Sequence, residues 1–100
     1  MKKVYDGQVL LLRHGIVVTQ VSFYQVIRST TRTCEVRKLK KKIIEQSHNE
    51  QKVIPAVDDF SDLPVRCAVL DSGCVKIDEK KHAWPWKGDP EWQTVVIFIP

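Results

Sequence analysis

Two stretches of alternating side chains, separated by a Ser/Thr turn, constrain the fold of this chain more than any other feature of its sequence. In the first stretch, Val21 to Arg28, successive side chains such as Phe23 and Tyr24 point to opposite sides of an extended strand. The second stretch, Thr33 to Leu39, alternates in the same way. β-branched and aromatic residues dominate the first stretch. The sequence therefore predicts that the two stretches form an antiparallel hairpin.

Further short apolar runs lie between turn signals along the rest of the chain. They are Gln8 to Arg13, Lys52 to Val57, Val65 to Leu70, Val75 to Glu79 and Thr94 to Ile99. Pro55 indicates an edge strand or a bend, and Asp71-Ser72-Gly73 is typical of a hairpin turn. Strands this short and this frequent in 100 residues predict one all-β or β-dominated domain, spanning residues 1–100. A small antiparallel SH3-like or OB-like barrel or a curved sheet is expected.

The segment from Leu39 to Gln46 fits two structures. Leu39 and Ile43 would share one face of a helix, and lysines favour helix formation. No N-cap residue precedes the segment, however, and the residues before it already resemble a strand. We therefore expect a continued or bent strand, with one short helix near residues 39–46 as the alternative.

Basic residues are concentrated in the first half of the chain. Residues 1–50 carry ten Lys and Arg against four Asp and Glu, a net charge of +6, whereas residues 51–100 carry six against eight, a net charge of −2. A basic stripe attracts nucleic acid through phosphate contacts, but lysines also protect edge strands from pairing. The basic candidates for partner binding are Arg28, Arg32, Arg37, Lys38, Lys40, Lys41 and Lys42.

All three tryptophans lie in the segment from Trp84 to Trp92, where prolines and a glycine predict a turn. Trp is enriched at binding hot spots. A small domain also needs large rings to cover its core, because it has few of them. Trp84 and Trp86, with the neighbouring Lys87, are therefore candidates for partner contact, and core anchoring is the alternative for the rings.

The sequence carries no catalytic signature. No nucleophile motif surrounds a cysteine, and the four glycines are scattered singly. The soft ligands for a structural zinc ion would be Cys34, Cys67, Cys74 and His82, although the gap between Cys67 and Cys74 is longer than in a zinc knuckle. The alternative is that the three thiols are buried, reduced and structural. We expect a non-enzymatic protein that has no cofactor or only a structural zinc ion.

Composition also bears on where the protein works. The longest apolar run, Val95 to Ile99, is five residues, far short of a membrane span. The first residues lack the apolar region of a secretory signal, and an odd number of cysteines fits a reducing compartment. These features predict a cytoplasmic protein without membrane contact.

Short motifs resemble a family of small, uncharacterised β-rich proteins from bacteriophages and mobile elements. They are Gly7-Gln8-Val9-Leu10, His14-Gly15, the strand Thr19 to Val26, and Trp86-Lys87-Gly88-Asp89-Pro90. The chain departs from the family at Arg13-His14-Gly15-Ile16, where the family has a Trp-Gly-Tyr turn, and around Gly88, where acid and base are exchanged. The resemblance implies a small β-rich fold and a phage or mobile-element origin.

That resemblance supports one functional hypothesis, and the residues support another. Small single-domain phage proteins include anti-CRISPR inhibitors, so the first hypothesis is a protein that binds a host protein or ribonucleoprotein complex, such as a Cas effector, and inhibits host defence in the host cytosol. The second is a small nucleic-acid-binding β-barrel that uses the basic hairpin on phosphates and a tryptophan to stack a base.

Overall fold

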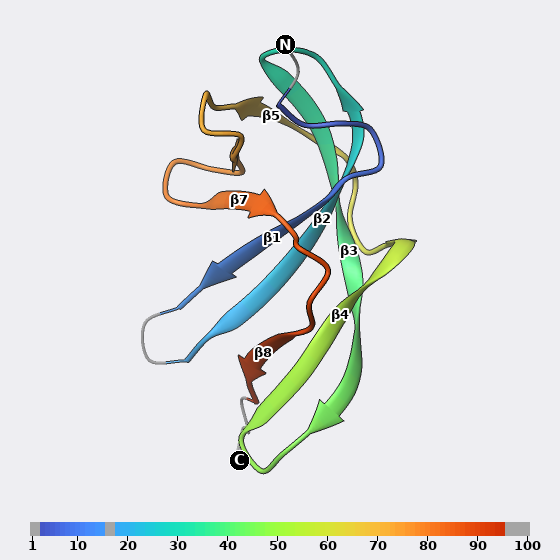
Figure 1. The fold of residues 1–100 in the computed structure, drawn as a ribbon, viewed down its shortest axis with the longest axis vertical. Coiled ribbons are helices and arrows are strands. Elements are labelled where there is room, and N and C mark those ends of the chain that lie inside the picture. The colour runs from blue at the N-terminus through green and yellow to red at the C-terminus, as the bar shows by residue number, and fades with distance from the viewer. Residues whose placement is uncertain (1–2, 16–17, 96–100) are drawn as a thin grey trace.

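The computed structural model describes residues 3–15 and 18–95 of the chain and shows an all-β fold, as predicted (Figure 1). The described residues contain no helix, and every strand pairing is antiparallel. The strands are β1 (Val9–His14), β2 (Gln20–Ser29), β3 (Thr33–Gln46), β4 (Glu50–Phe60), β5 (Val65–Val69), β6 (Val75–Lys76), β7 (His82–Pro85) and β8 (Glu91–Thr94).

Six of these strands close into a small barrel. Their order is β2-β1-β7-β6-β5-β3, and β2 pairs with β3 to complete the ring. The β2–β3 pair is the predicted hairpin, with Phe23 opposite Leu39 and Val26 opposite Val36. Closure removes free strand edges from the ring, so its backbone groups pair within the protein.

The other two strands extend the sheet beyond the barrel. The second half of β3 pairs with β4, and β4 pairs with β8. The β3–β4 register slips between Leu39 and Lys41 and again between Ile43 and Glu45, and such bulges bend a strand. The segment from residue 39 to residue 46 is therefore a bent continuation of β3, and the short-helix alternative is wrong.

Two hydrophobic clusters lie on opposite faces of the β1–β2–β3 sheet. One fills the barrel and includes Leu10 and Val36. The other lies between this sheet and β4 and includes Phe23 and Val53, with Trp86 packed against it. Because β1 and β2 are covered on both faces, each carries apolar side chains on both: Leu10 and Val26 belong to the first cluster, and Leu11 and Phe23 lie in the second.

The C-terminal part of the chain differs from the sequence-based expectation. The last strand was expected from Thr94 to Ile99, whereas β8 spans Glu91–Thr94 and residues 96–100 lie outside the described residues. Pro55 is buried within β4, next to the first register slip, where a bend was expected. Within the described residues, no helix is long and apolar enough to cross a membrane.

Candidate binding surface on the outside of the barrel

The barrel strands turn alternate side chains outward. In β5, Cys67 is buried in the barrel, while Arg66 and Ala68 on either side of it are exposed. In β7, Ala83 is buried, so His82 and Trp84 point outward. Because side chains alternate with a period of two, the register shows which outward residues become neighbours.

The outward side chains form two rows across the barrel. In the first row, Arg28 of β2 lies opposite Glu35 of β3, which lies opposite Arg66 of β5. The second row runs over β3, β5, β6 and β7 and consists of Thr33, Ala68, Lys76 and His82. Along these rows β2 and β7 are four strand spacings apart, about 19 Å along the curved surface, whereas on the other side of the barrel only β1 lies between them.

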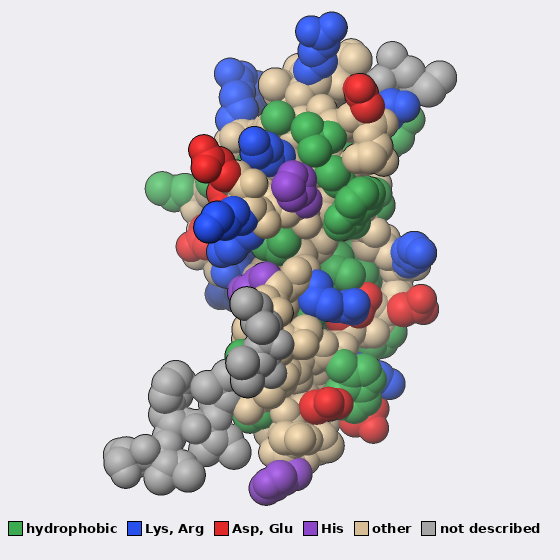
Figure 2. Space-filling view, turned by 90° about the vertical axis from the view of Figure 1, so that its left-hand side faces the viewer, with side chains coloured by type: hydrophobic (Ala, Val, Ile, Leu, Met, Phe, Trp, Pro, Cys, Tyr) green, Lys and Arg blue, Asp and Glu red, His purple; other side chains and the backbone are tan. Residues whose placement is uncertain are grey.

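This outer face is basic. The two rows contain Arg28, Arg66 and Lys76, against one carboxylate, Glu35. The ion pairs within residues 3–15 and 18–95 are formed elsewhere: Arg13–Glu91, Lys40–Asp59 and Lys52–Glu45. Figure 2 shows Lys and Arg side chains over the upper half of the side that carries β5 and β7, around a histidine next to a hydrophobic patch, with a few Asp and Glu side chains among them.

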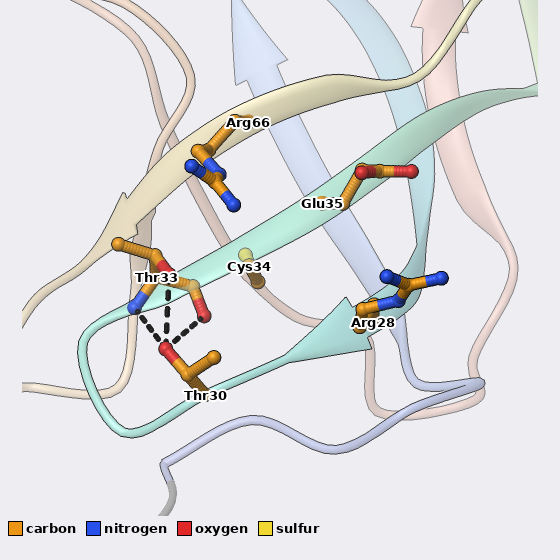
Figure 3. A pocket seen from close by; sticks show the side chains of 6 residues that line it. All are labelled: Arg28, Thr30, Thr33, Cys34, Glu35 and Arg66. Carbon is orange, nitrogen blue, oxygen red and sulfur yellow. Dashed lines mark hydrogen bonds between the residues drawn. The ribbon is translucent and has the colours of Figure 1, made fainter.

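A small pocket opens beside the first row, at the β2–β3 turn. It has a volume of about 50 Å³ and is lined by Arg28, Thr30, Thr33, Cys34, Glu35 and Arg66. Figure 3 shows the Arg66 side chain reaching toward Thr33, whereas the side chains of Glu35 and Arg28 lie together at the other end. The Thr33 amide donates to Thr30 Oγ1 over 3.1 Å, which holds the turn beside the pocket.

The three tryptophans have different environments. Trp86 packs edge-on against Phe23 with ring centroids 5.8 Å apart, and its Nε1 donates to the Asp89 carbonyl over 2.8 Å. Trp92 lies on β8 with the Lys52 ammonium 5.2 Å from its ring centroid. Trp84 is 51% exposed on the outward face of β7. Trp86 is therefore placed as a core anchor and Trp84 as an accessible aromatic surface.

Several of the predicted basic residues contact other parts of the protein. The Arg37 guanidinium lies 4.6 Å from the centroid of the Phe60 ring, and its Nε donates to the Asp62 carbonyl over 2.7 Å. Lys40 forms an ion pair with Asp59 at 3.5 Å. These contacts hold the end of β4 and the turn that follows it against β3.

Lys41 replaces a missing strand contact. Past Leu39, β3 no longer pairs with β2. The Lys41 ammonium instead donates to the Val21 carbonyl over 2.7 Å and to Gln93 Oε1 over 2.8 Å. Partial burial of the ammonium group in these contacts, together with the nearby charge of Lys38, lowers the pKa of Lys41, although most of the residue is exposed. The remaining predicted basic candidates, which are exposed or partly exposed, are Arg32, Lys38, Lys42 and Lys87.

Arg66 and Lys76 were missed by the sequence analysis. They come from short strands distant in sequence from the basic hairpin, and only the register brings them into rows with Arg28 and Thr33. The available signal was weak, because each is simply a polar position next to a buried one in a short apolar run.

The predicted zinc ligands are not brought together. Cys34 and Cys67 are buried and lie opposite each other on β3 and β5, but Cys74 lies at the β5–β6 turn and His82 points outward. Burial, with a contribution from Cys67, raises the pKa of the Cys34 thiol to about 11. Within residues 3–15 and 18–95, no three His, Cys, Asp or Glu side chains are grouped to hold a metal ion.

The outer side of the barrel carries polar, charged and aromatic groups that can bind a ligand. Guanidinium and ammonium groups supply charge and hydrogen-bond donors, threonine hydroxyls add further donors, and Trp84 supplies a flat apolar surface. Comparisons with models of known protein families, with curated proteins and with solved structures found no match to this chain.

Proposed function

We propose that this chain is a non-enzymatic module that binds single-stranded nucleic acid on the outer face of its barrel. The observation that carries the proposal is the register that places Arg28, Arg66 and Lys76 at outward positions of the barrel, together with the exposure of Trp84 on the outer side of β7. The three cations would contact phosphates, and the exposed indole would stack on an unpaired base.

The arrangement of charge and ring favours a single strand over a duplex. Lys76 lies opposite His82, and Trp84 is two residues further along the same face of β7, a diagonal distance of about 7–8 Å. A base stacked on Trp84 would therefore have its phosphate within reach of Lys76. Stacking of this kind requires an unpaired base, which a duplex does not offer.

The salt dependence of binding tests this proposal. A short fluorescent single-stranded oligonucleotide should bind with an affinity that falls with salt at a log–log slope of roughly −2 for three phosphate contacts. Replacing Arg66 and Lys76 together by Ala should reduce the magnitude of the slope by roughly 1.4. Trp84→Ala should weaken binding by about 1–3 kcal/mol.

The matched control removes the same charge elsewhere. Lys42 and Lys87 are exposed and lie outside the two rows, so replacing both by Ala should affect binding less than replacing Arg66 and Lys76. Equal losses for the two double variants would show that the protein attracts nucleic acid only through its overall charge. Absence of binding at low salt would refute the proposal.

The host-defence inhibitor is the second candidate, and exposed apolar side chains favour it. Leu63 is 79% exposed and Val65 52% exposed, on the segment that leads into β5, and apolar side chains at a surface often mark protein contacts. The resemblance to phage proteins adds the suggestion that the partner is a host defence complex such as a Cas effector.

An inhibition assay separates this candidate from the first. The chain should reduce DNA cleavage by a purified Cas effector, and a variant with Leu63→Ser and Val65→Ser should lose that effect while keeping its oligonucleotide affinity. If the effector retains full activity at saturating protein, the effector tested is not the target. If inhibition survives the double serine variant but disappears with Arg66→Ala, the basic face is responsible instead.

A further inference from the structure

We infer that the pocket between Arg28 and Arg66 binds one terminal phosphate group. Inorganic phosphate and the phosphorylated end of an oligonucleotide share this chemistry, and the inference rests on the proposed function only where nucleic acid supplies the phosphate. The pocket combines two cationic side chains from different strands with hydroxyl groups from the turn that joins β2 and β3.

The size of the pocket restricts its ligand to a small group. Its volume is about 50 Å³, whereas sites for drug-sized ligands enclose roughly 300–1,000 Å³. A base or a sugar would not fit inside it. A single oxyanion would, with the rest of its molecule lying over the barrel surface.

The two arginines approach the pocket from opposite sides. Arg28 comes from β2 and Arg66 from β5, with β3 between them, so their backbones are about 10 Å apart. Figure 3 shows the two side chains at different ends of the pocket. A guanidinium presents paired donors that match phosphate oxygens, and an anion between the two needs oxygens directed to both sides.

The threonines add a hydroxyl donor. Thr30 Oγ1 accepts from the Thr33 amide and lies 2.9 Å from Thr33 Oγ1, and either hydroxyl can donate to the other. When Thr30 is the donor, the proton of the Thr33 hydroxyl is free to donate to a bound anion. Donors from three directions suit the three oxygens of a terminal phosphate better than the two of a carboxylate.

Glu35 sets the charge of the pocket and makes the inference sharply testable. It lies between the two arginines in the register, and none of the ion pairs formed within the described residues includes it. With Arg28 and Arg66 at +2 and Glu35 at −1, its carboxylate opposes a bound anion. Glu35→Gln should therefore tighten phosphate binding roughly threefold to tenfold.

The first experiment uses inorganic phosphate alone. Arginine Nε–Hε signals in nuclear magnetic resonance spectra should shift saturably for Arg28 and Arg66 with phosphate, but not with chloride at equal ionic strength. Arg66→Ala should abolish saturation, and Arg66→Lys, which keeps the charge but loses the paired donors, should weaken binding. Arg13→Ala, which removes a guanidinium near the end of β1 that pairs with Glu91, should leave it unchanged.

Two outcomes would overturn the inference. One is the absence of saturable shifts in the wild-type protein. The other is that Glu35→Gln binds phosphate more weakly than the wild type, or equally well, while its circular dichroism is unaltered. A carboxylate that merely bridges two surface arginines would give that result. Both readouts are independent of whether the protein binds oligonucleotides.

The second experiment identifies the source of the phosphate. Two oligonucleotides of one sequence, with and without a terminal phosphate, are compared for binding to the wild type and to Arg66→Ala. Tighter binding of the phosphorylated strand that disappears in Arg66→Ala supports nucleic acid as the source. If both oligonucleotides bind equally, or neither binds, while inorganic phosphate still shifts the arginine signals, the ligand of the pocket is free phosphate. If neither oligonucleotide binds, the proposed function is also refuted.

Discussion

The two halves of β3 both carry apolar side chains, but in opposite environments. Cys34, Val36 and Leu39 in the first half are buried, whereas every residue from 40 to 46 is exposed, including Ile43 at 49% and Ile44 at 46%. The first half lies within the barrel between β2 and β5, whereas the second half pairs with β4 outside it. The comparison teaches that the energetic value of an apolar residue depends on what packs over it and not on its strand alone.

The largest expected effect is in the cluster on the outer side of the β1–β2–β3 sheet. Phe23 is fully buried there and contacts Trp86, so Phe23→Ala should lower the free energy of unfolding by about 3–5 kcal/mol. Denaturant unfolding followed by circular dichroism measures it. A loss below about 1 kcal/mol would show that this second cluster does not support the fold.

Trp86 and Trp84 give a second comparison between a packed and an exposed apolar side chain, two residues apart in the sequence. Trp86→Ala should cost about 2–3 kcal/mol, because the ring packs on Phe23 and donates to Asp89. Trp84→Ala should cost less than about 1 kcal/mol, because half of the residue is exposed. The same unfolding measurement compares them, and a reversed order would mean that the assignment of core anchor and binding surface is wrong.

Alkaline pH should act on the buried half of β3. The pKa of the Cys34 thiol is raised from 9.0 to about 11 by burial, so above pH 9 the unfolded chain loses this proton before the folded one does. Its contribution to stability is complete below pH 9 and is lost as the pH rises to about 11, which corresponds to about 1 kcal/mol at pH 10.

Cys34→Ala isolates this effect. Burial also raises the pKa values of Cys67 and Tyr24, which act in the same direction, whereas burial lowers the pKa of Lys41, which acts in the opposite one. The variant should lose less stability than the wild type between pH 8 and pH 10, whatever its stability at neutral pH. Parallel pH profiles would contradict the burial of Cys34 as a neutral thiol.

The smallest expected effect is at the exposed end of the same strand. Ile44→Ala should change the free energy of unfolding by no more than about 0.5 kcal/mol. Val36→Ala, eight positions earlier and 1% exposed, should cost roughly 2 kcal/mol. If Ile44→Ala were the more costly change, the second half of β3 would have to be covered in solution by another surface.

The sequence alone determined where most strands form and which side chains share a face of each strand, although it predicted a turn from Trp84 to Trp92, where the structure has the ends of β7 and β8 on either side of a shorter turn. The alternation from Val21 to Arg28 and from Thr33 to Leu39 predicted the β2–β3 hairpin, which the structure confirms. The sequence did not decide whether residues 39–46 form a strand or a helix, because two isoleucines and several lysines fit either periodicity. Strand formation and the face to which each side chain points depend on neighbouring residues, so a short sequence pattern is enough to predict them.

Only the tertiary structure decided which strands meet and how they are covered. The pairing of β5 with β3 placed Cys67 opposite Cys34 and Arg66 opposite Glu35, and no spacing in the sequence indicated either pair. The pairing of β6 with β5 placed Lys76 on the outer side of the barrel, one strand beyond Arg66, and the separation of β3 from β2 turned Lys41 toward the Val21 carbonyl. Register between distant strands depends on how the whole barrel closes and packs, and a shift of one residue would turn every one of these side chains to the opposite face.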